Sequence, residues 1–330
     1  MFFGEIKTES SENAILSSSI SIDNKQSNIK IKKGTKIDNN HINLLLQNNI
    51  NFIFCAQLEK DDIEENIAVH RVSQSLINKN KSNLKISKAH EGRSNIISNV
   101  DGVLKFDSHQ LFCVNSVADE IGVASLKEYS FVNKNQIIAS IKSITFSVNK
   151  YVLEKIQKEA KNCFQVLPFL KLNVHLIQTK TKDTLDKVLN KTFSVTEQRL
   201  KKFGINNFVN KTCDHNIKSL SENIKNSVNQ GADVIFVFGA SAISDIKDII
   251  PESLKKNNGS IIRLGMPVEP GNLMLLGKIR ISERDVTFIG MPGCARSPKE
   301  NGVDWIIWRI FCGLEVSNKD INHMGNGGLL

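Results

Sequence analysis

The run Val234-Ile-Phe-Val-Phe238, which lies between Gly231 and Gly239, constrains the fold of this chain more than any other stretch. Consecutive β-branched and aromatic residues predict a strand buried on both faces, as in a parallel sheet that helices cover on both sides. A glycine directly after such a strand lets the backbone turn tightly, and the N–H groups that follow can bind an anion. We therefore expect a ligand site where this strand ends.

Strands and helices are predicted to alternate through the second half of the chain. The expected strands are 172–178, 233–238, 273–279 and 286–289. The expected helices are 193–203, 215–230, 251–256 and 303–314. This alternation predicts an α/β fold, with a C-terminal three-layer α/β/α domain over 169–330 and right-handed crossovers. Ligands of such sheets bind outside the carboxyl ends of the strands, where the loops 179–184, 239–248 and 290–299 fall.

The first half predicts a β-rich N-terminal domain over 1–168, which ends in a connecting helix over 151–163. Its other expected elements are strands within 29–37 and over 136–148, helices over 38–48 and 64–77, and a hairpin at Asp101-Gly102. His90, Arg93 and Asn95 form a polar cluster that we interpret as part of an exposed loop.

The composition argues against several classes of protein. The net charge is +9, but the cations are mostly lysines scattered among Asn, Ile and Ser, without the basic stripe and interleaved aromatics of a nucleic-acid surface. The cysteines are spread singly without a CxxC pair, which predicts reduced thiols and a cytoplasmic protein. No stretch approaches about eighteen uninterrupted apolar residues, so we expect no membrane span, and the first residues lack a signal-peptide pattern.

Two of the Gly- and Pro-rich loops carry small residues and cations that suit an anionic ligand. Gly239-Ala240-Ser241 suits an anion cradle, although a tight strand-to-helix turn would use the same residues. Arg296 and Lys299 flank Ser297 before the last helix, where a bound anion would offset their unfavourable relation to the helix dipole; solvated surface cations are the alternative. If Arg296 binds a ligand phosphate, Arg296→Ala should weaken binding and leave the unliganded fold unharmed or slightly more stable.

Carboxylates and a thiol in the same loops suggest further chemistry. Asp245 and Asp248 lie three apart, so on a helical turn both would face one side and suit Mg²⁺ or another hard cation. Capping of a helix start is the alternative for this pair. Cys294 is interpreted as a small residue that fills a tight loop, with raised thiolate character beside the helix start as the alternative.

Residues 172–314 resemble the molybdopterin-binding fold shared by molybdopterin adenylyltransferase and molybdopterin molybdotransferase. The segment Gly239-Ala-Ser-Ala-Ile-Ser-Asp245 resembles the family's double-Gly loop, which ends in an acidic residue. Gly265-Met-Pro-Val-Glu-Pro-Gly-Asn272 resembles the Pro-Gly loop of the molybdotransferase, and Ile289-Gly-Met-Pro-Gly-Cys-Ala-Arg-Ser297 resembles its Leu-Pro-Gly-Asn-Pro-Val segment. Thr179 falls where the family has Thr-Gly after its first strand.

The resemblance implies a cytoplasmic protein of molybdenum cofactor biosynthesis that binds molybdopterin or adenylylated molybdopterin. The residues that it places at the ligand are Thr179, Gly239, Ala240, Ser241, Pro270, Gly271, Asn272, Pro292, Gly293, Arg296, Ser297 and Lys299. Asp245 and Asp248 would be the catalytic, Mg²⁺-binding pair of a transferase.

Within that family, the resemblance is strongest to the molybdopterin-binding half of bifunctional cofactor-maturation proteins, which carry a nucleotidyltransferase domain after it. Two roles stay open: a molybdopterin molybdotransferase that inserts molybdate, or a non-catalytic carrier that hands the cofactor to a nucleotidyltransferase or a molybdoenzyme. A homo-oligomer is compatible with either role. Ala240 and Ala242 replace family glycines, and Cys294-Ala-Arg replaces Asn-Pro-Val, changes that affect catalysis more than binding.

Overall fold

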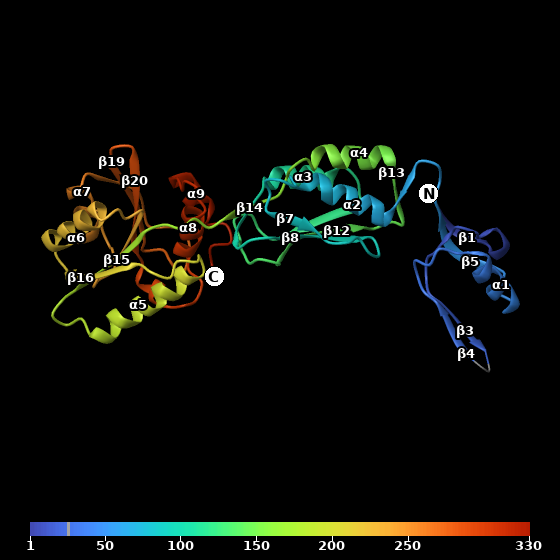
Figure 1. The fold of residues 1–330 in the computed structure, drawn as a ribbon, viewed down its shortest axis with the longest axis horizontal. Helices are drawn as coiled ribbons and strands as arrows, with labels where there is room; N and C mark the ends of the chain where they lie inside the picture. The colour runs from blue at the N-terminus through green and yellow to red at the C-terminus, as the bar shows by residue number, and fades with distance from the viewer. Residues whose placement is uncertain (25–26) are drawn as a thin grey trace. The chain divides into compact units, whose positions relative to one another are not determined.

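The chain forms two compact units, which we describe separately from a computed structural model that covers residues 1–24 and 27–330 (Figure 1). The first unit comprises Met1–Val100 and Leu104–Leu167, and the second comprises Asp101–Val103 and Pro168–Leu330. The expected boundary after residue 168 lies beside the passage from Leu167 to Pro168. The short segment Asp101–Val103 is a further passage between the units that the sequence pattern did not indicate.

A six-stranded sheet organises the second unit. Its strands are β15 (Val174–Lys180), β16 (Val209–Asp214), β17 (Val234–Phe238), β18 (Gly259–Leu264), β19 (Leu275–Ile281) and β20 (Arg284–Met291). They follow the order β16-β15-β17-β20-β19-β18, in which the first four are parallel and the last two pair antiparallel. Every residue of β17 is buried, as the unbroken apolar run predicts.

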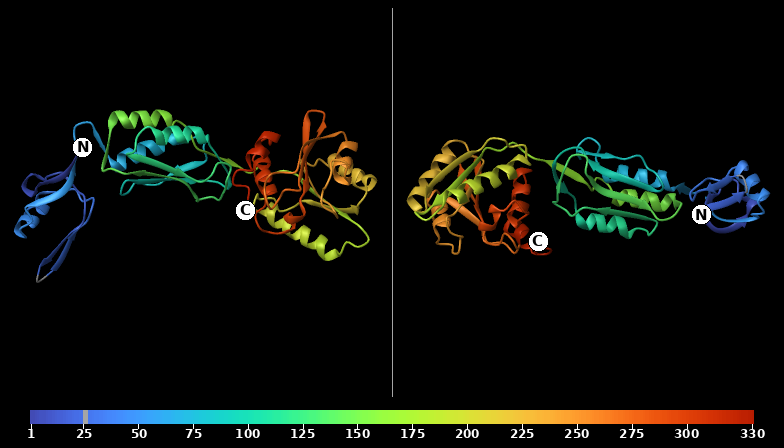
Figure 2. Two further views of the ribbon diagram at one scale, coloured as in Figure 1. Left: turned by 180° about the vertical axis from the view of Figure 1, so that it is seen from behind. Right: turned by 90° about the horizontal axis from the view of Figure 1, so that it is seen from below.

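Helices cover both faces of this sheet, so the expected three-layer α/β/α architecture is confirmed (Figures 1 and 2). The helices are α5 (Asp186–Lys201), α6 (Ile217–Asn229), α7 (Ile249–Lys256), α8 (Gly302–Phe311) and α9 (Asn318–His323). On one face, Ile235 and Val237 of β17 pack with apolar residues of α6 and α7. On the other, the Phe236 ring lies 6.3 Å from that of Phe311 in α8, as the two-residue alternation of a strand requires.

Several element boundaries in this unit differ from the expected ones. The edge strands β16 and β18 were not predicted, because an edge strand needs no continuous apolar run. Helix α6 begins at Ile217 with Asn216 as its N-cap, rather than at His215. Helix α7 begins at Ile249, before Pro251, because the Asp248 side chain caps it.

The first unit is rich in short strands, as expected. The part before residue 58 contains β1 (Phe2–Lys7), η1 (Thr8–Ser10), β2 (Ile15–Leu16), β3 (Ile20–Asn24), β4 (Ser27–Ile31), α1 (Asn39–Gln47) and β5 (Phe52–Gln57). Strands β1, β5 and β2 form one sheet, and β3 pairs with β4. A separate apolar cluster that includes Leu16, Leu45 and Ile53 stabilises this part.

The remainder of the first unit surrounds a larger core that α2, β12 and α4 share. Its helices are α2 (Glu65–Leu76), α3 (Ser108–Ser116) and α4 (Lys150–Glu159). Its strands are β6 (Asp62–Glu64), β7 (Leu84–Ile86), β8 (Arg93–Ser98), β9 (Gly102–Lys105), β10 (Ile121–Ser125), β11 (Phe131–Val132), β12 (Ile137–Ser143), β13 (Ser147–Asn149) and β14 (Gln165–Pro168). The sheet orders are β10-β12-β8-β7, β11-β9-β14 and β13-β6.

Three expectations for this region are wrong. Arg93 and Asn95 lie on β8 rather than in a loop, because β7 and β8 form a hairpin that turns at Glu91-Gly92. Both turn residues have positive φ, +47° and +65°, which matches the right-handed twist of the flanking strands. Asp101-Gly102 makes no hairpin, since β8 and β9 belong to different sheets, and the long strand over 136–148 is divided into β12 and β13.

Candidate functional site at the carboxyl ends of the parallel strands

Three neighbouring strands end in polar groups that are hydrogen-bonded to one another. Thr179 lies near the end of β15, His215 follows β16, and Ala240 and Ser241 follow β17. The Ala240 N–H donates to Thr179 Oγ1 at 2.9 Å, Thr179 Oγ1 lies 2.7 Å from His215 Nδ1, and His215 Nε2 lies 3.0 Å from Ser241 Oγ. Thr179 is buried and Ser241 is exposed, so this network runs from the core to the surface.

The loop after β17 has the features of an anion-binding turn. A side chain at Gly239 would place its Cβ 2.5 Å from the Ser241 carbonyl oxygen, so only glycine permits this backbone path. The backbone N–H groups of Ser241, Ala242 and Ile243 donate to no other group in the described ranges. Unpaired N–H groups after a strand of a parallel sheet are suited to an oxyanion or phosphate.

Arg296 reaches this loop from β20. It ends the short 3₁₀ helix η2 (Gly293–Arg296), and its Nη2 donates to the Gly239 carbonyl at 2.8 Å while Nε donates to Thr192 Oγ1 at 3.1 Å. The guanidinium carbon lies 5.0 Å from the centre of the Phe238 ring. Burial lowers the pKa of Arg296, but a guanidinium stays protonated at neutral pH, so its charge lies beside the loop.

The sequence suggested that Arg296 lies at the start of the helix that is labelled α8 in the structure. Instead, Arg296 ends η2, before that helix begins. Helix α8 begins at Gly302, and its N-terminus is occupied by groups of the same chain. Asn301 caps it, the Val303 N–H donates to Asn301 Oδ1 at 3.1 Å, and the Gly302 N–H donates to the Pro270 carbonyl at 2.8 Å. These bonds leave no anion site of the expected kind at this helix end.

The loop that contains Pro270, Gly271 and Asn272 packs against the start of α8. Gly271 has φ +137°, and a Cβ there would lie 2.8 Å from Asn301 Oδ1 and from the Gly302 nitrogen. Asn272 is exposed, and its carbonyl accepts a bond from the Met266 N–H at 3.0 Å. Asn301, the N-cap of α8, also contacts η2, because its Nδ2 lies 3.0 Å from Cys294 Sγ.

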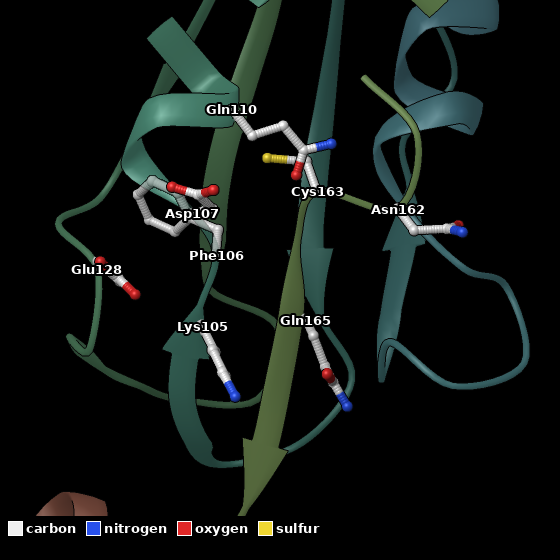
Figure 3. Close-up of a pocket in the computed structure, with 8 residues that line it drawn as sticks. All are labelled: Lys105, Phe106, Asp107, Gln110, Glu128, Asn162, Cys163 and Gln165. Carbon is white, nitrogen blue, oxygen red and sulfur yellow. The ribbon is translucent and has the colours of Figure 1, made fainter. Parts of the chain in front are cut away.

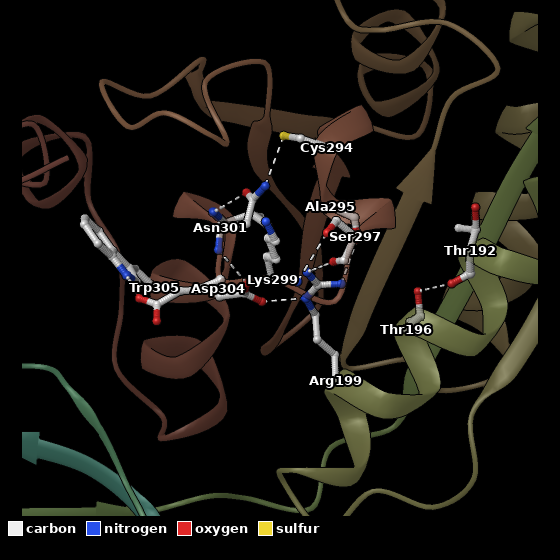
Figure 4. Close-up of polar contacts among 12 residues, drawn as sticks. Thr192, Thr196, Arg199, Cys294, Ala295, Ser297, Lys299, Asn301, Asp304 and Trp305 are labelled. Atoms are coloured by element: carbon white, nitrogen blue, oxygen red, sulfur yellow. Dashed lines mark hydrogen bonds and ion pairs between the residues drawn. The ribbon is translucent and has the colours of Figure 1, made fainter. Parts of the chain in front are cut away.

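Arg199 of α5 stabilises the backbone of the turn that carries Arg296 (Figure 4). Arg199 Nε lies 2.6 Å from Asp304 Oδ1, and its two Nη atoms donate to the Ala295 and Ser297 carbonyls at 2.7 and 2.9 Å. The Arg199 and Asp304 side chains are only 8% and 7% exposed. Burial raises the pKa of the Asp304 carboxyl, an effect that the Arg199 charge opposes.

The remaining residues of the β20–α8 connection have separate positions. Pro292 is buried, and its carbonyl accepts the Ala295 N–H at 3.0 Å, whereas Gly293 and Lys299 are exposed. The Lys299 N–H donates to Ser297 Oγ at 3.3 Å.

Asp245 and Asp248 are the first and last residues of one turn, in which the Asp248 N–H donates to the Asp245 carbonyl at 3.1 Å. Asp248 precedes α7 and uses both oxygens: Oδ1 accepts the Ile249 N–H at 2.6 Å, and Oδ2 accepts the Ser244 N–H at 3.1 Å. Asp245 Oδ1 accepts the Lys247 N–H at 2.7 Å. Across the described ranges, no group of three or more His, Cys, Asp or Glu side chains is arranged to hold a metal ion.

The structure thus brings together Thr179, Gly239, Ala240, Ser241 and Arg296 from the predicted set. His215 was missed, because it lies on no periodic pattern and follows an edge strand that was itself not predicted. One signal for it exists: β16 pairs in parallel with β15, so the residue after Asp214 reaches the same sheet edge as Thr179.

The first unit contains a cavity of about 440 Å³ beside the start of α3 (Figure 3). Lys105, Asp107, Gln110 and Gln165 are among the residues that line it. Cys163 also lines it, but burial raises the pKa of this thiol to about 12. The thiol therefore stays protonated at neutral pH and is a poor nucleophile.

Comparisons with known proteins were made over the whole chain. No family model matches the chain, and no curated protein sequence matches it. Among solved structures, it is similar to the tungsten cofactor synthesizing protein MoaB from Pyrococcus furiosus, with 17% identity and a TM-score of 0.29 over 42% of this chain and 91% of that chain.

Two further structures are similar at the same level. MogA matches with 19% identity and a TM-score of 0.28, over 42% of this chain and 92% of that chain. A molybdenum cofactor biosynthesis protein from Pyrococcus furiosus matches with 13% identity and a TM-score of 0.25, over 77% of this chain and 72% of that chain.

Proposed function

We propose that this protein binds molybdopterin in molybdenum cofactor biosynthesis, with the phosphate of the ligand on the loop after β17. The observation that carries the proposal is the set of unpaired N–H groups of Ser241, Ala242 and Ile243 at the carboxyl end of a central parallel strand. The Arg296 charge beside Gly239 adds to it. The order of the loops that resemble the molybdopterin-binding family supports molybdopterin as the anion.

The carrier role is the second candidate, and the two carboxylates bear on it. A transferase would hold Mg²⁺ through Asp245 and Asp248, but Asp248 already accepts backbone hydrogen bonds on both oxygens. A bound cation would have to share these oxygens with the Ile249 and Ser244 N–H groups. A carrier would shield the pterin and transfer it to a nucleotidyltransferase or a molybdoenzyme.

Calorimetric titration of the purified protein with molybdopterin tests the binding. Ala240 is exposed, so Ala240→Leu should fold normally but obstruct the approach of the ligand to the loop and abolish measurable binding. Ala124→Leu, at an exposed position on β10 of the other unit, is the matched control. Equal affinity of the Ala240 variant and the parent protein would contradict the proposal.

A turnover assay separates the two roles. The protein is incubated with adenylylated molybdopterin, molybdate and Mg²⁺, and formation of the molybdenum-containing cofactor is measured. A carrier binds the pterin without forming product, whereas a molybdotransferase forms product in an Asp245-dependent manner.

A further inference from the structure

The bonds that join Thr179, His215 and Ser241 can be assigned a direction. Thr179 Oγ1 accepts the Ala240 N–H and also lies 2.7 Å from His215 Nδ1. A backbone N–H can only donate, whereas a hydroxyl can donate one hydrogen and accept others. Two arrangements are therefore conceivable: Thr179 donates to His215 Nδ1, or a protonated Nδ1 donates to Thr179.

Burial of Thr179 decides between them. The side chain is 2% exposed, and within the described ranges its hydroxyl has no hydrogen-bond partner besides the Ala240 N–H and the His215 ring. If Nδ1 carried the hydrogen, Thr179 Oγ1 would accept two bonds and its own buried hydrogen would have no acceptor. A buried unpaired donor is unfavourable, so Thr179 donates to Nδ1.

The directions of the remaining hydrogen bonds follow from this step. A neutral imidazole that accepts at Nδ1 carries its hydrogen on Nε2, which lies 3.0 Å from Ser241 Oγ. Ser241 Oγ then accepts from His215, and its own hydrogen is available to a group outside the protein. Because Ser241 is exposed and its backbone N–H is unpaired, this hydroxyl belongs to the same donor set as the loop amides.

We propose that Thr179, His215 and Ser241 form a one-way hydrogen-bond chain whose last hydroxyl donates to a phosphate oxygen of the bound ligand. His215 is a positioning residue, since it fixes the Ser241 oxygen as an acceptor and so directs the serine hydrogen outward. Ser241 is thereby a ligand donor rather than a nucleophile, because an imidazole with its hydrogen on Nε2 cannot take the serine proton. The identity of the ligand rests on the proposed function, but the direction of the chain does not.

The direction is measured without any ligand. Nitrogen-15 NMR of histidine-labelled protein distinguishes the two neutral tautomers, and His215→Gln identifies the His215 signals by their loss. We expect the Nε2–H form of His215 to exceed the Nδ1–H form by about tenfold or more. Thr179→Val should reduce that excess, whereas Thr179→Ser should preserve it. A predominant Nδ1–H form would overturn the proposal.

Ligand donation is measured with molybdopterin and, separately, with inorganic phosphate as probes. Ser241→Ala should weaken binding roughly tenfold, and Ser241→Thr should retain affinity because it keeps the hydroxyl. His215→Gln, whose amide can donate near the Nε2 position, should bind better than His215→Leu. Phosphate binding that depends on Ser241 in a protein that ignores molybdopterin would refute the proposed function and leave the donor chain intact. Binding of neither probe, or equal binding of Ser241→Ala, would overturn the donor role.

Discussion

At the scale of the residue, Arg296 shows how one cation can stabilise the interior beside the loop that we propose as the ligand site. Its guanidinium joins three segments: η2, the Gly239 carbonyl after β17, and Thr192 of α5. Lys299, three positions later, is exposed and joins none of them through its side chain. Two cations that look equivalent in the sequence therefore differ in what they stabilise.

Arg296→Ala should destabilise the unliganded protein, contrary to the expectation from the sequence. The variant loses two hydrogen bonds from a charged donor and the packing on Phe238, so the free energy of unfolding should fall by about 1.5–3 kcal/mol. Urea denaturation measures this change. Lys299→Ala is the control and should be within about 0.5 kcal/mol of the parent protein. Equal stability of the two variants would show that the Arg296 bonds are not formed in solution.

Substitutions of Asp248 separate capping from metal binding. Asp248→Ala removes the N-cap of α7 and should lower the free energy of unfolding by about 1 kcal/mol, whereas Asn keeps one acceptor oxygen. Asp248→Asn should therefore lose less stability than Asp248→Ala and keep molybdopterin affinity. If the protein is a molybdotransferase that uses this carboxylate, the same Asn variant should lose turnover. Thermal denaturation and the turnover assay are run on both variants.

At the scale of the element, the sequence predicted those strands and helices that have a clear pattern of apolar residues. The buried strand β17 and the amphipathic α8 have such patterns, and both form, although α8 spans 302–311 instead of the expected 303–314. Strands β16 and β18 lie at sheet edges and carry mixed residues, so their signal comes from pairing with neighbours that only the fold brings together.

The residues of the candidate site likewise divide into those that the sequence could predict and those that it could not. The Gly239–Ser241 turn is a local feature of the chain and could be anticipated from small residues after a strand. The Arg199–Asp304 pair joins residues 105 positions apart, and no spacing rule indicates it. The Pro270–Gly271 loop was placed at the ligand because it resembles a family motif, yet its glycine is required by close packing on Asn301 and Gly302.

The buried Arg199–Asp304 pair should be costly to break from one side. Asp304→Ala leaves the Arg199 charge buried and partly unpaired, so we expect the free energy of unfolding to fall by about 3–5 kcal/mol. On α5, the helix that contains Arg199, Lys201 and Glu197 form an exposed ion pair 3.0 Å apart. Lys201→Ala is therefore a matched control that should change stability by about 0.5 kcal/mol or less. Chemical denaturation of both variants gives the comparison, and similar losses would contradict it.

At the scale of the whole molecule, the cysteines form no disulfide, and half of them are buried. All six are free, and Cys55, Cys163 and Cys213 are buried. None of the helices within 1–24 and 27–330 is long and apolar enough to cross a membrane. Burial raises the pKa of Cys163 and Cys312 to about 12 each. Ionisation of these two thiols therefore links the stability of the protein to pH.

Stability should consequently fall at alkaline pH. An unfolded thiol ionises near pH 8.5, whereas these two remain protonated in the folded state up to about pH 12. The contribution of each thiol is complete below about pH 8.5 and is lost as the pH rises toward 12, since ionisation favours the unfolded chain. Denaturation midpoints between pH 7 and 10.5 measure this loss. Cys163→Ala should reduce the slope, Cys113→Ala should leave it unchanged, and identical slopes in all three proteins would disprove the link.

The passage of Asp101–Val103 into the second unit has a consequence for synthesis on the ribosome. The Val103 backbone makes a hydrogen bond to Cys312, which follows it by 209 residues. At about 5–20 residues per second, the ribosome needs about 10–40 s to add them. Gly102 and Val103 belong to β9, whose sheet partners β11 and β14 are synthesised well before Cys312. The bond from Val103 to Cys312 is therefore added to a strand whose own sheet has already had time to form.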